Sequence, residues 1–365
     1  MYIAEPRADP TDSRPGLAEG QTTGRGVVDG ASRDTILLIG GTGQNGATLL
    51  SRLLAGIPGI VPIGELGFLW DRALQGNLPC GCGAPFDACP FWGAVGRSAF
   101  GGWGRVDAEE AVRLRSTLQS AGRHRHLSLP LAFPQMVWPN LSRRHRNALV
   151  RYLDLVQRVY EGVRAVSEAR VIVDATKVPW HGFMLWNGGH VDLRVAHLVR
   201  DSRGVAFSNV KLVPRQSSVD GKTQRGGYPP IRTATRWIWV NLAYEVLTLA
   251  GAPVAIFRYE DLVRDPRGEL TRVAAHAGVA TSRAELGFIR DGEAELPVAH
   301  LVAGNRLRSA TGPIRIVADE EWRTGLRRSQ RRLVSAMTWP LMLRYRQRTV
   351  HARSLTATGP DVPAS

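Results

Sequence analysis

The sequence contains few of the residues that mark secreted or membrane-embedded proteins. Only three of its 365 residues are cysteines, too few to cross-link a chain of this length and an odd number for a disulfide framework. Its first 33 residues are polar and rich in glycine and proline, and they contain no apolar stretch that resembles a signal peptide. We therefore expect a cytoplasmic protein.

Long hydrophobic runs are also missing. The most apolar stretch runs from Trp237 to Phe257, and Asn241, Gly251 and Pro253 interrupt it. Such interruptions favour a buried helix followed by a short strand over a membrane-spanning helix. We therefore expect no stable membrane insertion.

Lysine is scarce, although the chain is strongly basic. The 47 lysine and arginine residues exceed the 32 acidic ones by 15, and only Lys177, Lys211 and Lys222 are lysines. An excess of this size indicates a polyanionic partner such as a nucleotide, a phosphate or nucleic acid. The arginines are scattered through helical stretches, without a helix-turn-helix, zinc-finger or aromatic RNA-binding signature. A basic nucleic-acid-binding protein is therefore the weaker interpretation, and we expect no nucleic acid partner.

Short apolar runs alternate with helical patterns, which is typical of an α/β fold with a parallel sheet flanked by helices. The predicted strands are 36–39, 60–63, 171–173, 195–199 and 254–257. They belong to one predicted domain over residues 34–345, with a helical insertion at about 107–168 and a mobile loop at about 211–230. Segments 1–33 and 346–365 are expected to be disordered because they are polar and rich in small residues.

A glycine-rich turn follows the first predicted strand and leads into a helix. Backbone N–H groups of such a turn, together with the helix N-terminus, can hold an anion closely. The segment lacks the lysine of a Walker A loop, and no acidic residue follows the next strand at the place a dinucleotide fingerprint requires. The residues predicted to bind the anion are Gly41, Thr42, Gly43, Gln44, Asn45, Gly46, Ala47 and Thr48.

A second candidate anion site follows the strand at 195–199. Arg200 comes directly after this strand, and Ser208 follows eight residues later. We expect both at the start of the next helix, where a guanidinium and a hydroxyl can bind a second phosphate.

This combination closely resembles the sulfotransferases that use 3′-phosphoadenosine 5′-phosphosulfate (PAPS). The resemblance continues in order along the chain, at Gly64-Glu65, Cys80 to Trp92, Asp174 to Lys177, Phe257 to Leu262 and Gly304 to Arg308. It implies a fold like that of P-loop nucleotide hydrolases, with PAPS as co-substrate and adenosine 3′,5′-bisphosphate as product. It further implies that Tyr259 contacts the adenine, and that Gly304, Arg306 and Arg308 close over the 3′-phosphate.

The first loop departs from this family at residue 44. The family carries lysine or arginine where this chain has Gln44, and serine where it has Asn45. A cation there stabilises charge that develops on the leaving phosphate, so a weakly active or non-catalytic PAPS-binding relative is one alternative. Lys177 is our candidate for the compensating cation, since it follows the strand at 171–173 on the ligand side of a parallel sheet.

Sulfuryl transfer also needs a base for the acceptor hydroxyl or amine. The resemblance makes Glu65 the first candidate, and His181 is the second. A small molecule, a carbohydrate or a lipid would each suit as acceptor, and nothing in the sequence indicates an oligomeric state. A P-loop phosphotransferase with Asp174 as magnesium ligand is a further alternative, which the missing lysine of the first loop disfavours.

The three cysteines form a short cluster, Cys80, Cys82 and Cys89. Three thiols without a fourth ligand at suitable spacing make a poor zinc site. We therefore expect them to pack in a turn-rich loop, and we expect no metal.

Overall fold

The computed structural model describes residues 34–119, 142–211, 213–214, 224–225 and 227–357. The segment 1–33, predicted to be disordered, lies outside this part of the chain. These described residues belong to one compact unit.

A five-stranded parallel sheet lies at the centre of this unit, with strand order β2-β3-β1-β4-β7. The five predicted strands are all confirmed, and each extends by one to three residues beyond its predicted range. Their bounds are β1 Thr35–Gly40, β2 Ile60–Gly64, β3 Val171–Asp174, β4 Asp192–Val199 and β7 Val254–Arg258.

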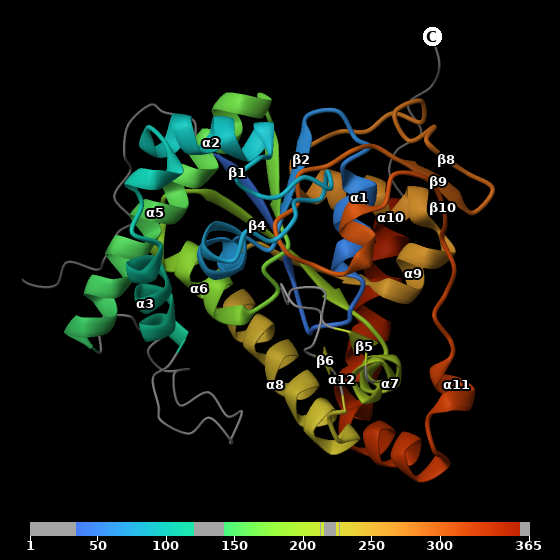
Figure 1. The fold of residues 1–365 in the computed structure, drawn as a ribbon. Coiled ribbons are helices and arrows are strands. Elements are labelled where there is room, and N and C mark those ends of the chain that lie inside the picture. The colour runs from blue at the N-terminus through green and yellow to red at the C-terminus, as the bar shows by residue number, and fades with distance from the viewer. Residues whose placement is uncertain (1–33, 120–141, 212, 215–223, 226, 358–365) are drawn as a thin grey trace, which may run out of the picture. The chain divides into compact units, whose positions relative to one another are not determined.

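Helices cover both faces of the sheet, so β1 is apolar at successive positions. Leu37 and Ile39 pack toward α1 (Ala47–Leu54), α9 (Tyr259–Arg264) and α10 (Pro266–His276), which form one layer. Ile36 and Leu38 point to the other face, which α5 (Arg143–Ser167), α6 (Pro179–Gly188) and α8 (Pro230–Leu249) cover. Figure 1 shows these two layers on opposite sides of the sheet. The predicted α/β class is therefore confirmed.

The predicted insertion is helical where the structure describes it. It contains α3 (Ala108–Gln119) and the long α5, whose apolar stripe packs into the core beside α2 (Pro90–Phe100). Between β2 and α2 the chain forms a 3₁₀ turn, Leu66–Phe68, and a π-helix, Leu69–Gln75, and a second 3₁₀ turn, Trp103–Arg105, follows α2.

The remaining elements follow β4 and β7 in the chain. They are α7 (Ser202–Val210), the paired short strands β5 (Val213–Pro214) and β6 (Gln224–Arg225), β8 (Ile289–Arg290), β9 (Glu293–Leu296), the 3₁₀ turn η5 (Arg306–Ser309), β10 (Gly312–Arg315), α11 (Trp322–Gly325) and α12 (Arg328–Ala357). Strands β8, β9 and β10 form a separate antiparallel sheet that the sequence did not predict.

Two predicted segments, the C-terminal tail and the loop at 211–230, lie partly outside the described residues. Helix α12 runs through residue 357, past residue 346 where the predicted tail begins, and 358–365 lie outside the described residues. Much of the predicted mobile loop, at 212, 215–223 and 226, also lies outside them. The apolar stretch from Trp237 divides as expected into α8 and β7. No helix among the described residues is both long and apolar enough to cross a membrane.

Candidate anion-binding and catalytic site

Most of the predicted site residues gather at one edge of the sheet because all five strands are parallel. Their carboxyl ends meet there, and β1 lies at the point where the connections diverge to β2 on one side and β4 on the other. In open α/β sheets this switch point is the usual place for a ligand crevice. The residues that follow the strand ends are Glu65 after β2, Lys177 after β3, the glycine turn after β1, Arg200 after β4 and Tyr259 after β7.

The glycine turn is held in shape by Asn45, whose side chain is fully buried. Its Nδ2 donates to the carbonyls of Gly40 (3.2 Å) and Leu198 (2.8 Å), and its Oδ1 accepts from the N–H of Ala47 (3.1 Å). The amide thus joins β1, β4 and the first turn of α1. All of these partners are protein groups, so the Asn45 side chain stabilises the shape of the anion loop through contacts within the protein.

The end of this turn requires glycine at position 46. Gly46 has φ 94°, a left-handed conformation, and a Cβ added there would lie 2.5 Å from the ring of Tyr259. Glycine alone allows both the backbone angle and the close approach. The aromatic ring that the resemblance assigns to the adenine therefore lies directly against the anion loop.

Arg200 is the cation most closely tied to this loop. Its Nη1 donates to the backbone carbonyl of Gln44 at 2.8 Å, and its guanidinium lies over the Tyr259 ring, 4.6 Å from the centroid. Its Nη2 binds Asp319 at 2.8 Å, and the N–H of Asp319 donates to the Tyr259 hydroxyl. Burial raises the pKa of Tyr259, so this hydroxyl stays protonated. Loop, guanidinium and ring form one contiguous surface.

Ser208 lies differently from the prediction. Helix α7 begins at Ser202, with Asp201 as its N-cap, so Ser208 is in the last turn and the expected position at the helix start is wrong. Gly204 faces Arg200, since a Cβ there would lie 3.2 Å from the guanidinium Nε. Ser208 is four residues further and therefore shares the face of α7 that turns toward Arg200.

The late basic loop, residues 304–308, lies close to the start of α1. Val302 pairs with β2 through backbone hydrogen bonds to Ile63 and Glu65. A Cβ on Gly304 would lie 3.7 Å from the hydroxyl of Thr48, which places this loop over the start of α1. Further on, Arg308 is buried, whereas Arg306 is exposed.

Glu65 and Lys177 form an ion pair at the ends of the neighbouring strands β2 and β3. Both side chains are mostly buried, and Arg72 adds a second cation 3.8 Å from the Glu65 carboxylate. Burial lowers the pKa of Arg308, and the attraction of Glu65 partly opposes this shift, so Arg308 also lies within the field of this carboxylate. The backbone carbonyl of Lys177 accepts from the Tyr244 hydroxyl at 2.8 Å. Three cations thus surround one carboxylate beside the glycine turn.

His181 does not join this group. It is fully buried, with Nε2 2.8 Å from Asp174 Oδ2, and the Tyr160 hydroxyl donates to the same oxygen at 2.8 Å. Asp174 Oδ1 accepts from the backbone N–H of Thr176. Burial raises the pKa of Asp174, but attraction to His181 and these hydrogen bonds outweigh it, and the pKa is lowered overall. His181 therefore acts as a core partner of Asp174, and Asp174 is fully buried with both carboxylate oxygens engaged by protein donors, which does not suit the magnesium ligand of a phosphotransferase.

Three residues of this region were missed in the sequence: Arg72, Tyr244 and Asp319. Arg72 lies in the π-helix, Tyr244 in the middle of α8, and Asp319 in an irregular segment before α11. Each reaches the site through contacts between distant segments. No local motif marks them, so spacing along the chain could not have found them.

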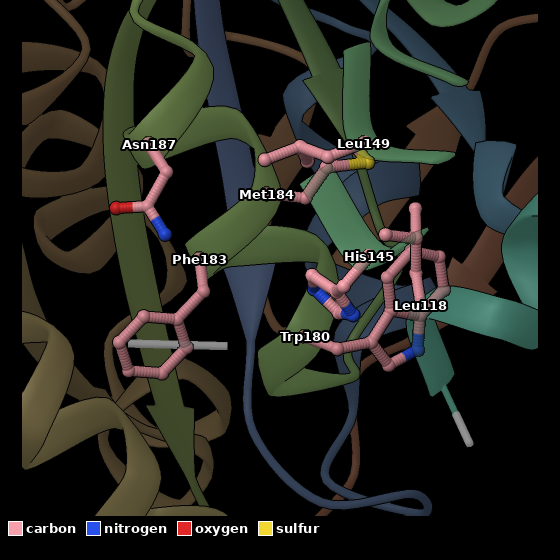
Figure 2. Close-up of a pocket in the computed structure, with 7 residues that line it drawn as sticks. All are labelled: Leu118, His145, Leu149, Trp180, Phe183, Met184 and Asn187. Atoms are coloured by element: carbon pink, nitrogen blue, oxygen red, sulfur yellow. The ribbon is translucent and has the colours of Figure 1, made fainter. Parts of the chain in front are cut away.

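A small hollow opens between α3, α5 and α6 (Figure 2), and none of the predicted site residues line it. Its accessible volume of about 10 Å³ corresponds to a single water molecule. Trp180 and His145 line it beside Leu118, the last described part of α3. It is therefore too small to be the acceptor site in the state described.

The cysteine cluster contains a fourth residue that spacing along the chain does not indicate. His300 lies beside the three thiols, with Nδ1 3.3 Å from the Sγ of Cys89 and 3.7 Å from that of Cys80. The premise that a fourth ligand is missing is therefore wrong. His300 belongs to the segment that leads into the late basic loop, 211 residues beyond Cys89.

No protein-family model matches the chain, and no curated protein matches it. Among solved structures, it is similar to the sulfotransferase domain from the curacin biosynthetic pathway, with 17% identity and a TM-score of 0.44 over 84% of this chain and 98% of that one. It is also similar to the sulfotransferase domain from the Synechococcus PCC 7002 olefin synthase, with 20% identity and a TM-score of 0.40 over 85% and 97%. Both neighbours are described as sulfotransferase domains.

Proposed function

We propose that this protein is a PAPS-dependent sulfotransferase that transfers a sulfuryl group to a hydroxyl or amine of a small-molecule, carbohydrate or lipid acceptor. The observation that carries this proposal is the continuous surface formed by the glycine turn, Arg200 and Tyr259. It offers backbone N–H groups for one anion, a forked cation for a second, and an aromatic ring between them. A nucleotide with phosphates at both its 5′ and 3′ positions matches these three features.

The reaction is an in-line displacement at sulfur. The acceptor oxygen or nitrogen forms a bond to sulfur while the bond from sulfur to the 5′-phosphate oxygen breaks. The proton of the acceptor passes to Glu65, and the leaving bisphosphate carries away the electron pair. We assign Glu65 the role of base because it lies at the end of β2, on the same edge of the sheet as the glycine turn and Lys177.

Charge on the leaving phosphate needs a cation, and residue 44 does not supply one. Lys177 lies at the end of β3, the strand next to β1, and Arg308 belongs to the loop that covers Thr48. We assign Lys177 the role of the missing cation, whereas Arg308 keeps the 3′-phosphate role that the resemblance implies. Electrostatic stabilisation of this kind is commonly worth about 3–4 kcal/mol in the transition state.

The first experiment is a calorimetric titration with adenosine 3′,5′-bisphosphate without metal. We expect saturable binding with one site per chain, and weaker binding of adenosine 5′-phosphate, which lacks the 3′-phosphate. Absence of bisphosphate binding, together with stabilisation by ATP and magnesium, would overturn the proposal in favour of a phosphotransferase.

The second experiment measures sulfuryl transfer from PAPS across a panel of hydroxylated and amine acceptors. Glu65→Gln should lower kcat roughly 10²- to 10⁴-fold while bisphosphate affinity stays within about threefold. Glu109→Gln, on the exposed face of α3, is the matched control and should leave both values unchanged. Full turnover in Glu65→Gln would exclude this residue as base.

The cellular compartment is a further part of this proposal. We propose that the protein works in the cytoplasm, since all three cysteines are free and lie beside a histidine.

A further inference from the structure

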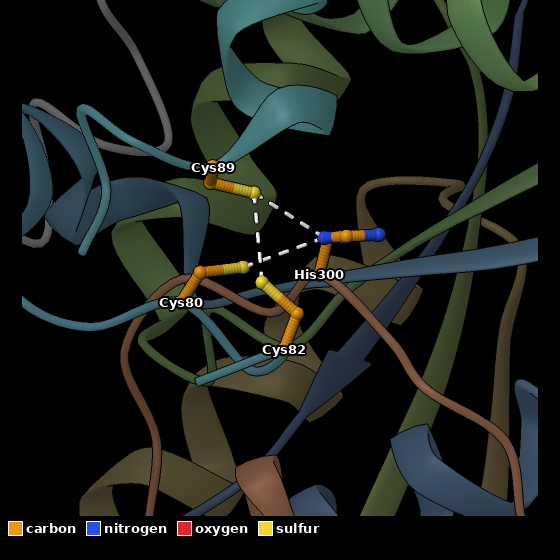
Figure 3. Close-up of side chains that lie close together, drawn as sticks. All are labelled: Cys80, Cys82, Cys89 and His300. Carbon is orange, nitrogen blue, oxygen red and sulfur yellow. Dashed lines mark hydrogen bonds between the residues drawn. The ribbon is translucent and has the colours of Figure 1, made fainter. Parts of the chain in front are cut away.

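The four side chains Cys80, Cys82, Cys89 and His300 point toward a common centre (Figure 3). Their ligand atoms all lie within 4.8 Å of one another. The measured separations are 3.7 Å between Cys82 Sγ and Cys89 Sγ, and 3.3 and 3.7 Å from His300 Nδ1 to Cys89 and Cys80. We propose that these four residues bind one Zn²⁺ ion, and that this ion fastens the cysteine loop to the late basic loop.

The separations match the edges of a zinc tetrahedron. Zn–S bonds of about 2.3 Å and Zn–N bonds of about 2.05 Å give edges of roughly 3.8 Å between sulfurs and 3.6 Å between sulfur and nitrogen. The three measured distances differ from these edges by a few tenths of an ångström at most, and every other pair of ligand atoms lies within 4.8 Å, about 1 Å or less above the edge length. Three thiolates and one imidazole also form a common ligand set of structural zinc sites.

Other cysteine chemistry fits this arrangement less well. An iron–sulfur cluster distributes its cysteines over two or more iron atoms, which separates their sulfurs, whereas here every ligand atom is close to every other. A disulfide would use two thiols at about 2.05 Å and leave the third thiol and the imidazole unused. The shared centre therefore favours a single ion, and three soft thiolates favour zinc over magnesium or calcium.

The backbone forms this site with a tight turn and a helix start. The N–H of Cys80 donates to the Ala84 carbonyl and the N–H of Gly83 to the Cys80 carbonyl, so Cys80 and Cys82 face the same way. Cys89 is the N-cap of α2, and its side chain makes no cap hydrogen bond.

The fourth ligand, His300, is held in its orientation by residues outside the cluster. The imidazole of His300 stacks on Phe91, with ring centroids 4.7 Å apart and planes 11° apart. Its backbone carbonyl accepts from Trp92 Nε1 at 3.0 Å. The first turn of α2 therefore holds both Cys89 and His300, as partners beyond the ligands do in other metal sites.

The cysteine loop lies directly against the backbone that carries the basic loop. The N–H of Gly81 donates to the Leu301 carbonyl, and a Cβ on Gly81 would lie 2.4 Å from the Ala299 carbonyl and 2.9 Å from that of Arg308. Only glycine fits so close to these carbonyls. Arg308 Nη2 donates in turn to the Pro79 carbonyl at 3.4 Å. A metal ion that joins His300 to the cysteines therefore stabilises the segment that positions Gly304 and Arg308.

The test begins with the metal content of the full native chain, produced with zinc in the medium and purified without chelators. We expect about one zinc per chain by plasma mass spectrometry, and visible bands of tetrahedral thiolate coordination after replacement by Co²⁺. Cys82→Ser, at a half-buried position, should lose most of the zinc. His190→Ala removes an exposed histidine outside the cluster and should keep one zinc per chain.

Three outcomes overturn the proposal: native protein with less than roughly a tenth of a zinc per chain, iron in place of zinc, or a mass two hydrogens lower from a disulfide. These measurements use the native chain, so they stand even if a cysteine variant fails to fold. Zinc removal by a chelator should lower the Tm by at least about 5 °C, because a structural metal contributes directly to folding.

The effect on the basic loop rests on the proposed function. If Arg308 contacts the 3′-phosphate, zinc removal should weaken bisphosphate binding at least about tenfold at a temperature where the chain remains folded. Stoichiometric zinc in a protein that does not bind the bisphosphate would contradict the proposed function alone. Unchanged bisphosphate affinity after complete zinc removal would overturn the fastening role, even with one zinc bound in the native chain.

Discussion

The glycine turn and the cysteine–histidine cluster are two ligand sites formed in different ways. The turn follows one strand and precedes one helix, so eight consecutive residues carry most of its backbone donors. The cluster joins a ten-residue loop to a histidine 211 residues beyond Cys89. The first is a local motif, whereas the second exists only after folding. The segment 299–308 connects them, because it carries His300 at one end and Arg308 at the other.

Arg200→Ala is expected to have the largest effect, because it should weaken ligand binding beside the glycine turn and leave the cysteine–histidine cluster unchanged. Loss of a buried forked cation should weaken adenosine 3′,5′-bisphosphate binding by about 2–4 kcal/mol, roughly 30- to 1000-fold, measured by calorimetry. Ser208→Ala should cost about 1 kcal/mol. Both variants should retain one zinc per chain.

Arg194→Ala provides the control for Arg200, since Arg194 lies on the same strand and is partly exposed beside Asp192. It should leave bisphosphate affinity unchanged. If neither Arg200→Ala nor Ser208→Ala changes this affinity, the assignment of the second phosphate site is wrong.

Gly46→Ala should destabilise the glycine turn itself. A methyl group there must adopt φ 94° and displace the Tyr259 ring, so we expect a loss of about 1–3 kcal/mol in stability, measured by denaturant unfolding, and weaker bisphosphate binding. Gly43→Ala is the matched control, because nothing lies within 4 Å of its added Cβ and its φ is not left-handed. Equal stability of the two variants would show that the contact with Tyr259 is not constraining.

Asp319→Asn should strengthen nucleotide binding. The Asp319 carboxylate now pairs with Arg200 at 2.8 Å, and it must compete with an incoming phosphate for the same guanidinium. Since Asp319 is partly exposed, we expect a gain of about 1 kcal/mol, roughly fivefold in affinity, that shrinks in high salt. Glu321→Gln neutralises a nearby exposed carboxylate and serves as control. Weaker binding in Asp319→Asn would mean that this residue positions Arg200 for the ligand.

Gln44→Lys is expected to have the smallest effect on binding. Gln44 already adopts φ 68°, and its backbone carbonyl, which accepts from Arg200, is present whatever the side chain. Bisphosphate affinity should stay within about threefold, while turnover of PAPS should rise because a cation is added near the leaving phosphate. A sharp loss of binding would reveal a specific role for the glutamine side chain.

Most of the central architecture was predictable from local pattern. The apolar runs at 36–39 and 195–199 are buried on both faces, so they were visible as strands, and the turn chemistry between strand and helix identified the anion loop. The antiparallel sheet β8-β9-β10 was missed because its strands are short and two of them alternate exposed with buried residues. His181 was taken as a candidate base because a sequence does not show that its imidazole is enclosed against Asp174.

The sequence by itself determined the parallel α/β class, the glycine turn and the side chains that follow each strand end, because these depend on residues close together in the chain. Tertiary structure alone decided that Asp319 forms an ion pair with Arg200, that Lys177 forms one with Glu65, and that His300 completes the cysteine cluster. The physical reason is that hydrogen bonds, ion pairs and metal coordination depend on distances of a few ångströms in space. Spacing along the chain does not encode those distances between segments that meet only when the core packs.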